Sequence, residues 1–102
     1  MATVDGFRAH AVIDSDVEDG ALELYLNAAM GYLNRSEVPA PSESEAAAHP
    51  TEAALYDLAA YQVATWYEEH RDMIGESVPA HVFGVQGIIH QLKGFFAGNN
   101  GG

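Results

Sequence analysis

Apolar residues recur at intervals of three and four positions in four stretches of the sequence, which is the period of an α-helix. The first stretch is short, from about Val4 to Ala11. The second extends from about Val17 to Asn34, the third from about Pro50 to Asp72 and the last from about Gly84 to Phe96. The pattern predicts an all-α fold, a small bundle of three main helices plus a short N-terminal helix.

The second predicted helix is apolar around most of its circumference. Helical spacing places one set of apolar residues on a single face, and a further set widens that surface: Leu22, Leu26, Met30 and Leu33 with Tyr25 and Ala29 beside them, then Ala21, Ala28 and Tyr32. Such a helix is usually covered on more than one side. We therefore expect another subunit to cover part of it, with contacts at Leu24 and Tyr32. The short polar residues Asp14, Ser15 and Asp16 are candidates to cap its start.

The third predicted helix is amphipathic. Its apolar stripe and the residues that flank the stripe are Leu55, Ala59, Val63, Trp66 and His70, then Tyr56, Ala60 and Tyr67. Trp66 and Tyr67 are expected mainly in the core. Leu58 and Tyr61 fall on the polar side, where a lone domain has no evident use for them, and we expect them at a subunit contact.

Residues 35–50 and the C-terminal residues have a different composition. The segment 35–50 is rich in Ser, Pro and Glu, which predicts an exposed acidic loop in which Ala46–Ala48 can add a helical turn. Residues 1–97 are expected to form one helical domain. Residues 98–102, all Gly or Asn, are expected to be a flexible tail. Phe95 and Phe96, just before this tail, are candidates to order on a partner.

The charge balance excludes one class of partner. The chain has 15 Asp and Glu but only four Lys and Arg, and its net charge is −11. A protein that grips nucleic acid needs clustered cations to neutralise phosphates, so this function is not expected. There is no cysteine, no signal-peptide pattern and no apolar run of the ~20 residues that cross a membrane. The sequence therefore predicts a protein made in a cytoplasm, without a membrane partner.

No motif for catalysis or metal binding is complete. The acidic run Asp14–Gly20 resembles a calcium loop, but Asp19 occupies the position of the turn glycine and Tyr25 that of the closing glutamate. The five histidines do not form a pair three or four positions apart. The serines lack a glycine-rich elbow, and the carboxylates lie on polar faces. We expect no enzyme activity, no metal site and no cofactor.

The end of the third predicted helix carries a recognisable pattern. Ala64-Thr65-Trp66-Tyr67-Glu68-Glu69-His70-Arg71-Asp72 resembles the aromatic, acidic and arginine signature of small head–tail connector (adaptor) proteins of tailed bacteriophages. The family typically has Ala-x-x-Trp-Tyr-Glu followed by Asn-Arg-Glu; this chain is one residue longer and has His70 in place of Asn. Phe7–Asp14 is similar to the opening segment of the family, and Phe83-Gly84-Val85 followed by Ile88, Ile89 and Leu92 is similar to its closing segment.

The resemblance implies a structural protein of the virion. Members of this family form a ring of identical subunits, normally twelve, beneath the portal protein at the head–tail interface. The ring extends the channel for DNA, which passes without specific binding, and is a platform for a neck, stopper or tail-completion protein. Trp66, Tyr67, Glu68 and Arg71 are the signature residues that the resemblance transfers to this chain. An alternative hypothesis is an acidic helical binding module or inhibitor that mimics DNA and acts by protein–protein contact.

Overall fold

The computed structural model describes residues 2–11, 18–74 and 84–96, and every secondary-structure element within these ranges is helical. The prediction of an all-α protein is therefore confirmed for these residues. The elements in chain order are α1 (Val4–Ala11), α2 (Asp19–Arg35), α3 (Glu43–Ala48), α4 (Pro50–Glu69), the short 3₁₀ helix η1 (Arg71–Met73) and α5 (Val85–Leu92).

The predicted bounds are close to the observed bounds at most helix ends. The observed bounds of α1 agree with the predicted bounds. Helix α4 begins at Pro50, as predicted, and proline is well tolerated in the first turn of a helix. Helix α4 ends at Glu69 and not at Asp72, because the chain tightens into η1 after His70. Helix α5 ends at Leu92, four residues before the predicted end, and Gly94 beyond it has a positive φ of 73°.

Helix α2 begins at Asp19 after the N-cap residue Glu18, which makes no side-chain capping hydrogen bond. The predicted capping residues Asp14, Ser15 and Asp16 lie outside the described residues. The predicted tail 98–102 also lies outside them.

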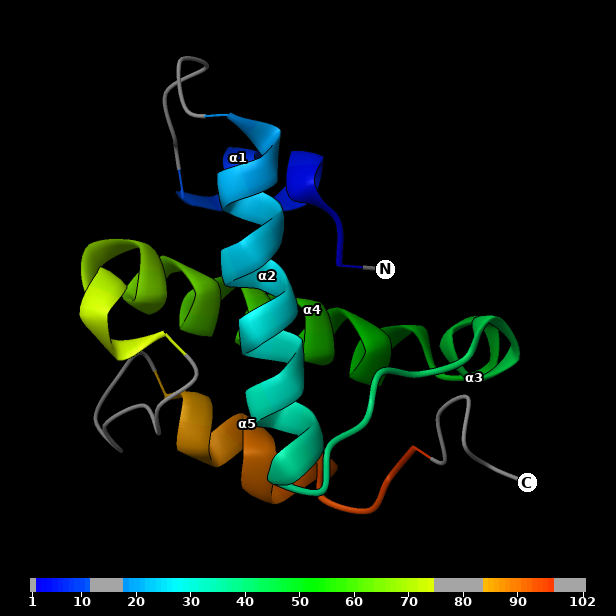
Figure 1. The fold of residues 1–102 in the computed structure, drawn as a ribbon. Coiled ribbons are helices and arrows are strands. Elements are labelled where there is room, and N and C mark those ends of the chain that lie inside the picture. Colours follow the sequence, from blue (N-terminus) through cyan, green and yellow to red (C-terminus); the bar gives the residue numbers. More distant parts are fainter. Residues whose placement is uncertain (1, 12–17, 75–83, 97–102) are drawn as a thin grey trace.

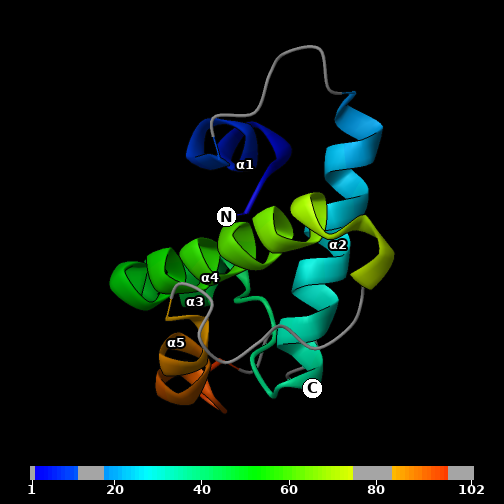
Figure 2. The same cartoon turned by 90° about the vertical axis from the view of Figure 1, so that its left-hand side faces the viewer.

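Helix α4 is the central element of the fold. It packs against α1, α2, α3 and α5, and its most extensive contact is with α2, which crosses it in Figure 1. Helices α1 and α5 lie on opposite sides of α4 in both views (Figures 1 and 2). An ion pair of 2.6 Å between Arg8 and Asp19 joins α1 to the start of α2. One long helix thus holds together elements that are far apart in the sequence.

The core of α4 is centred on a different part of the helix surface from the predicted stripe. Its buried residues are Ala53, Tyr56, Ala59, Ala60, Val63, Ala64 and Tyr67. Ala59 and Val63 of the predicted stripe are buried, as predicted. Leu55 and Trp66 are only partly buried and His70 is exposed, so the core face is centred nearer to the predicted flanking residues than to the stripe. Alanines at the buried positions allow neighbouring helices to approach closely. The predicted core face was instead centred on the larger apolar residues Leu55 and Trp66.

The predicted apolar faces of the other two main helices are confirmed more closely. Helix α2 buries Leu22, Tyr25, Leu26, Ala29, Tyr32 and Leu33, while Met30 is partly buried. Helix α5 buries Val85, Ile89 and Leu92, and Phe96 beyond it is also buried. The spacing of large apolar residues at intervals of three and four positions therefore predicted the buried face of both helices correctly.

The segment between α2 and α4 is more structured than the predicted acidic loop. Ser42 and Glu45 form a capping box, in which each side chain bonds the backbone N–H of the other residue, and this box starts α3. Val38 and Pro41, which belong to this segment, are buried. Glu37 joins it to the chain after α5, because its carbonyl accepts a hydrogen bond from the Gly94 N–H and its carboxylate pairs with Lys93 at 3.1 Å.

Candidate functional site

The aromatic residues of the family-like signature lie at the C-terminal end of α4. Tyr67 is fully buried in the core, as expected, whereas Trp66 is only partly buried. The Trp66 ring contacts the edge of Tyr67 at a centroid distance of 5.9 Å and stacks on the imidazole of His70 at 4.3 Å. A hydrogen bond of 2.9 Å joins His70 Nδ1 to the Trp66 carbonyl oxygen. Stacking on His70 thus covers part of the Trp66 ring at the surface.

The charged residues of the same signature form an exposed pair. The Arg71 guanidinium lies 3.6 Å from the Glu68 carboxylate, and its Nε donates to the Glu68 carbonyl oxygen at 3.4 Å. An exposed pair of this length contributes little to stability. Most of the Arg71 side chain remains accessible to solvent, so it is available for contact with another molecule.

Three large apolar side chains are exposed among the described residues. Leu24 on α2 is 55% exposed, Phe95 after α5 is 44% exposed and Met73 in η1 is 38% exposed. Leu24 and Phe95 were expected at an interface. The exposure of Met73 was not predicted, because this residue comes directly after the end of the predicted third helix at Asp72. Leu58, another expected interface residue, is partly buried.

Three other residues expected at an interface are engaged within the chain. Tyr32 is 7% exposed, and its hydroxyl accepts a hydrogen bond of 3.0 Å from Gln86 Nε2 of α5. Phe96 is 4% exposed and belongs to the core. The Tyr61 hydroxyl accepts a hydrogen bond of 3.1 Å from the Thr3 N–H. The idea that a lone domain has no use for Tyr61 was therefore wrong.

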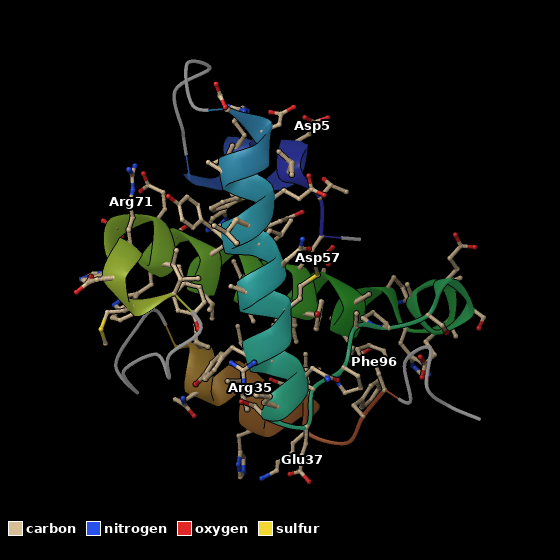
Figure 3. All side chains as sticks on the ribbon, in the orientation of Figure 1. Asp5, Arg35, Glu37, Asp57, Arg71 and Phe96 are labelled. Carbon is tan, nitrogen blue, oxygen red and sulfur yellow. The ribbon has the colours of Figure 1, made fainter. Side chains whose placement is uncertain are left out.

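The exposed apolar residues occur at different ends of the molecule. Figure 3 labels Arg71, in the same short 3₁₀ helix as Met73, on one side of α2, and Phe96, next to Phe95, on the other. Leu24 lies on α2 between exposed polar neighbours, Glu23 and Asn27.

The structure also contains a cavity that the sequence did not predict. Its volume is about 210 Å³, and its lining comes from the chain start, α2, the segment after α2, α3 and α4: Ala2, Met30, Ala40, Pro41, Ala46, Ala53, Tyr56 and Asp57. Tyr56 is 2% exposed, and its hydroxyl has no hydrogen-bond partner among the described residues. Burial, and then the neighbouring Asp57 carboxylate, raise the pKa of Tyr56 to about 12. The lining is thus apolar apart from one neutral hydroxyl and one carboxylate.

The acidic residues are spread over the surface and do not converge on a metal site. Exposed carboxylates occur on α1 to α4, on η1 and at positions just before and after α2: Asp5, Glu18, Asp19, Glu23, Glu37, Glu43, Glu69 and Asp72. In the described parts of the chain, no three His, Cys, Asp or Glu residues are grouped closely enough to hold a metal ion. No helix within these parts has the length and apolar character needed to span a membrane.

Comparison of the chain with protein-family models, with curated proteins and with solved structures finds no match.

Proposed function

We propose that this chain is a structural virion protein, a head–tail connector that forms a ring under the portal of a tailed bacteriophage. The ring, a dodecamer by the resemblance, extends the DNA channel and is the platform for a neck, stopper or tail-completion protein. The subunit would be assembled from the host cytoplasm into the head–tail interface. Its fold would be a small bundle in which α2, α4 and α5 are the three main helices.

The observation that carries the proposal is the placement of exposed apolar residues at separate ends of the molecule. Leu24, Met73 and Phe95 are exposed on different elements, and the segments that contain Met73 and Phe95 lie on opposite sides of α2 (Figure 3). A ring needs two different surfaces on each subunit, because each subunit contacts one neighbour with one surface and the next with the other. Apolar residues exposed on separate sides of the subunit can supply these two surfaces.

The positions of the signature residues are consistent with the same role. Tyr67 anchors the end of α4 in the core, while Arg71 is held beside Glu68 at the surface next to Met73. A buried anchor and an exposed arginine four positions apart combine stability with a site for contact. Glu68 keeps the guanidinium oriented without covering it.

The acidic surface supports a channel through which DNA passes. The net charge is −11, and exposed carboxylates occur on several elements. A negative surface repels the phosphate backbone, so DNA would slide past it without binding. Repulsion between acidic subunits opposes ring closure in solution, which is a reason for the ring to form only where the portal organises it.

The proposal is tested by adding the purified chain to DNA-filled, tailless heads of the phage that encodes it. Electron microscopy of the portal vertex should reveal an added ring, and heads incubated without the chain are the control. Heads that remain unchanged at saturating chain concentrations would contradict the proposal.

The alternative is an acidic binding module that mimics DNA, which the same net charge favours. A module of this kind should form a one-to-one complex with a basic DNA-binding protein and should add nothing to the portal vertex. Native mass spectrometry of the bound species separates the two functions, because a ring and a one-to-one complex differ several-fold in mass.

A further inference from the structure

Helix α2 has one face that points away from the core along its whole length. In Figure 1 the helix lies in front of α4 and α5, so its outer side is turned toward the viewer. Five residues on this side fall within an arc of about 80° at the helical spacing, and all are exposed or partly exposed: Gly20, Leu24, Asn27, Gly31 and Arg35. These five residues are called the α2 face below. Leu24, at 55% exposure, is its one large apolar side chain.

The glycines of the α2 face are not explained by packing within the described residues. Gly31 lies in the interior of α2, where glycine is one of the poorest helix formers. A Cβ atom added at Gly31 meets only the end of the flexible Arg35 side chain, at 3.4 Å, and one added at Gly20 meets no atom within 4 Å. A helix position without a side chain allows another helix to approach closely.

The α2 face is complementary to a second copy of itself in antiparallel orientation. When Asn27 lies opposite Ala28 of the second copy, Leu24 lies opposite Gly31. The two-fold symmetry of this arrangement places Gly31 opposite Leu24 as well. The exposed leucine of each copy then packs into the gap above the glycine of the other. The one large apolar side chain and the unexplained glycine thus satisfy each other.

The charges of α2 favour the antiparallel over the parallel orientation. Asp19 and Glu23 lie in the first two turns of the helix, and Arg35 lies in the last. Antiparallel pairing places the basic end of each copy near the acidic start of the other, whereas parallel pairing places like charges together. Antiparallel helix dipoles also attract. Arg35 already has an interaction within its own chain, and its long side chain has only to extend from above Gly31.

We propose that the α2 face binds a second copy of this chain in antiparallel orientation, with Leu24 of each copy packed on Gly31 of the other. The 17 residues of α2 give a contact about 25 Å long, which is shorter than a standard protein interface provides. The dimer is therefore weak, with a dissociation constant on the order of 0.1–1 mM. Salt at physiological ionic strength screens the repulsion between the remote charges of two acidic chains, because the Debye length is only about 8 Å.

This inference does not rest on the proposed ring. A connector and an acidic inhibitor could both pair through the α2 face. Leu24 also belongs to the surface proposed for ring contacts, so a given copy uses it in the pair or in the ring, not in both.

The first test uses single-cysteine variants, because the chain has no cysteine. Asn27 and Asn34 are both exposed on the same side of α2, seven positions apart, and are a matched pair. In the antiparallel dimer the two copies of residue 27 lie next to each other, whereas the two copies of residue 34 lie about 20 Å apart along the helix. Asn27→Cys should therefore form a disulfide-linked dimer at least tenfold faster than Asn34→Cys.

The oxidant in this test is diamide, which takes up the two electrons and two protons that the thiols lose. Each rate is divided by the rate at which the same thiol reacts with oxidised glutathione, because exposure and thiol pKa also affect reactivity. A parallel or random contact would give equal normalised rates for the two variants.

The second test is sedimentation equilibrium of the full chain at concentrations up to about 1 mM. Leu24→Ala should weaken the association about threefold or more, and Gly31→Leu should weaken it at least tenfold because the added side chain fills the gap. Gly87→Leu is the matched control, since it adds the same side chain at an exposed glycine of another helix, α5. This variant should associate as the unmodified chain does.

Three results would overturn the antiparallel pair: equal normalised rates for the two cysteine variants, no association at about 1 mM, or unchanged association of a folded Gly31→Leu variant. All of these measurements use the purified chain without phage heads. Their failure would leave the recruitment of the chain to heads untouched, and failure of that recruitment would leave the pair untouched.

Discussion

The hydroxyl of Tyr61 on α4 occupies the space that a side chain at Gly6 on α1 would need. A Cβ atom built on Gly6 overlaps the Tyr61 hydroxyl oxygen and lies 2.9 Å from the ring carbon that carries it. The Tyr61 ring is also parallel to that of Phe7, with centroids 6.4 Å apart and an interplanar angle of 9°. Helix α1 can thus pack closely on α4 because Gly6 has no side chain.

This contact predicts opposite effects of alanine at two helical glycines. Gly6→Ala should destabilise the protein by about 1–3 kcal/mol, because Tyr61 must move and its bond to the Thr3 N–H is weakened. Gly87→Ala in α5 should instead stabilise it by about 0.5–1 kcal/mol, since a Cβ there meets no atom within 4 Å and glycine is a poor helix former. Urea denaturation of both variants measures the two effects, and equal changes would contradict the contact.

Removal of a tyrosine hydroxyl should have different signs at Tyr56 and Tyr61. Tyr56→Phe should raise the free energy of unfolding by about 1 kcal/mol, because it removes a buried hydroxyl that has no partner among the described residues. Tyr61→Phe should lower it by about 0.5–1 kcal/mol, because the Thr3 N–H loses its acceptor. Denaturation midpoints of the two variants give the comparison. A loss of stability in Tyr56→Phe would show that its hydroxyl is satisfied in the folded protein.

Stability should fall in a defined alkaline range because of Tyr56. Its pKa is raised from 10.0 to about 12 in the folded chain. Below pH 10 the hydroxyl is protonated in both states, so its ionisation does not affect stability. Between about pH 10 and 12 the unfolded chain loses this proton first, and the folded state loses on the order of 2 kcal/mol relative to it.

The contribution of Tyr56 to this alkaline loss is isolated by comparison with Tyr56→Phe. Denaturation of both proteins from pH 8 to 12 should give a smaller decline in the variant, since the other tyrosines titrate in both. Identical pH profiles would mean that Tyr56 ionises at an ordinary pKa.

Charge placed on the exposed apolar residues should prevent assembly without unfolding the subunit. Leu24→Asp should lower the free energy of unfolding by less than about 0.5 kcal/mol, because its side chain is exposed. Phe95→Asp should lower it by about 1–2 kcal/mol, because the ring also packs edge-on against His49 and Phe96. Their recruitment to tailless heads should fall at least tenfold. Asn34→Asp is the control, since it adds the same charge at an exposed position of α2 without removing an apolar contact. Equal recruitment of all three variants would contradict the assigned interface.

The helical fold was predictable because large apolar residues mark one face of α2 and α5. Leu22, Leu26 and Leu33 on α2 are all buried, as their spacing predicts. The face of α4 was harder, because its core is rich in alanine, and the larger Leu55 and Trp66 shifted the apparent centre. Alanines signal close helix packing only once the neighbouring helices are known.

The candidate sites were less predictable than the helices. Exposure of Leu24 followed from its place in the sequence, but the intramolecular roles of Tyr32 and Tyr61 depend on partners 54 and 58 positions away. The capping box of α3 had a local signal, Ser42 followed three residues later by Glu45, within the segment expected to be a loop. Five separate parts of the chain line the cavity beside Tyr56, and a local sequence pattern does not predict which distant segments come together.

The proposed connector function is tested most directly by deleting the gene for this chain from its source genome and imaging the particles that this genome produces. The connector function predicts DNA-filled heads without tails, and tailed virions restored when the chain is supplied from a plasmid. Normal tailed virions in the deletion strain would contradict it.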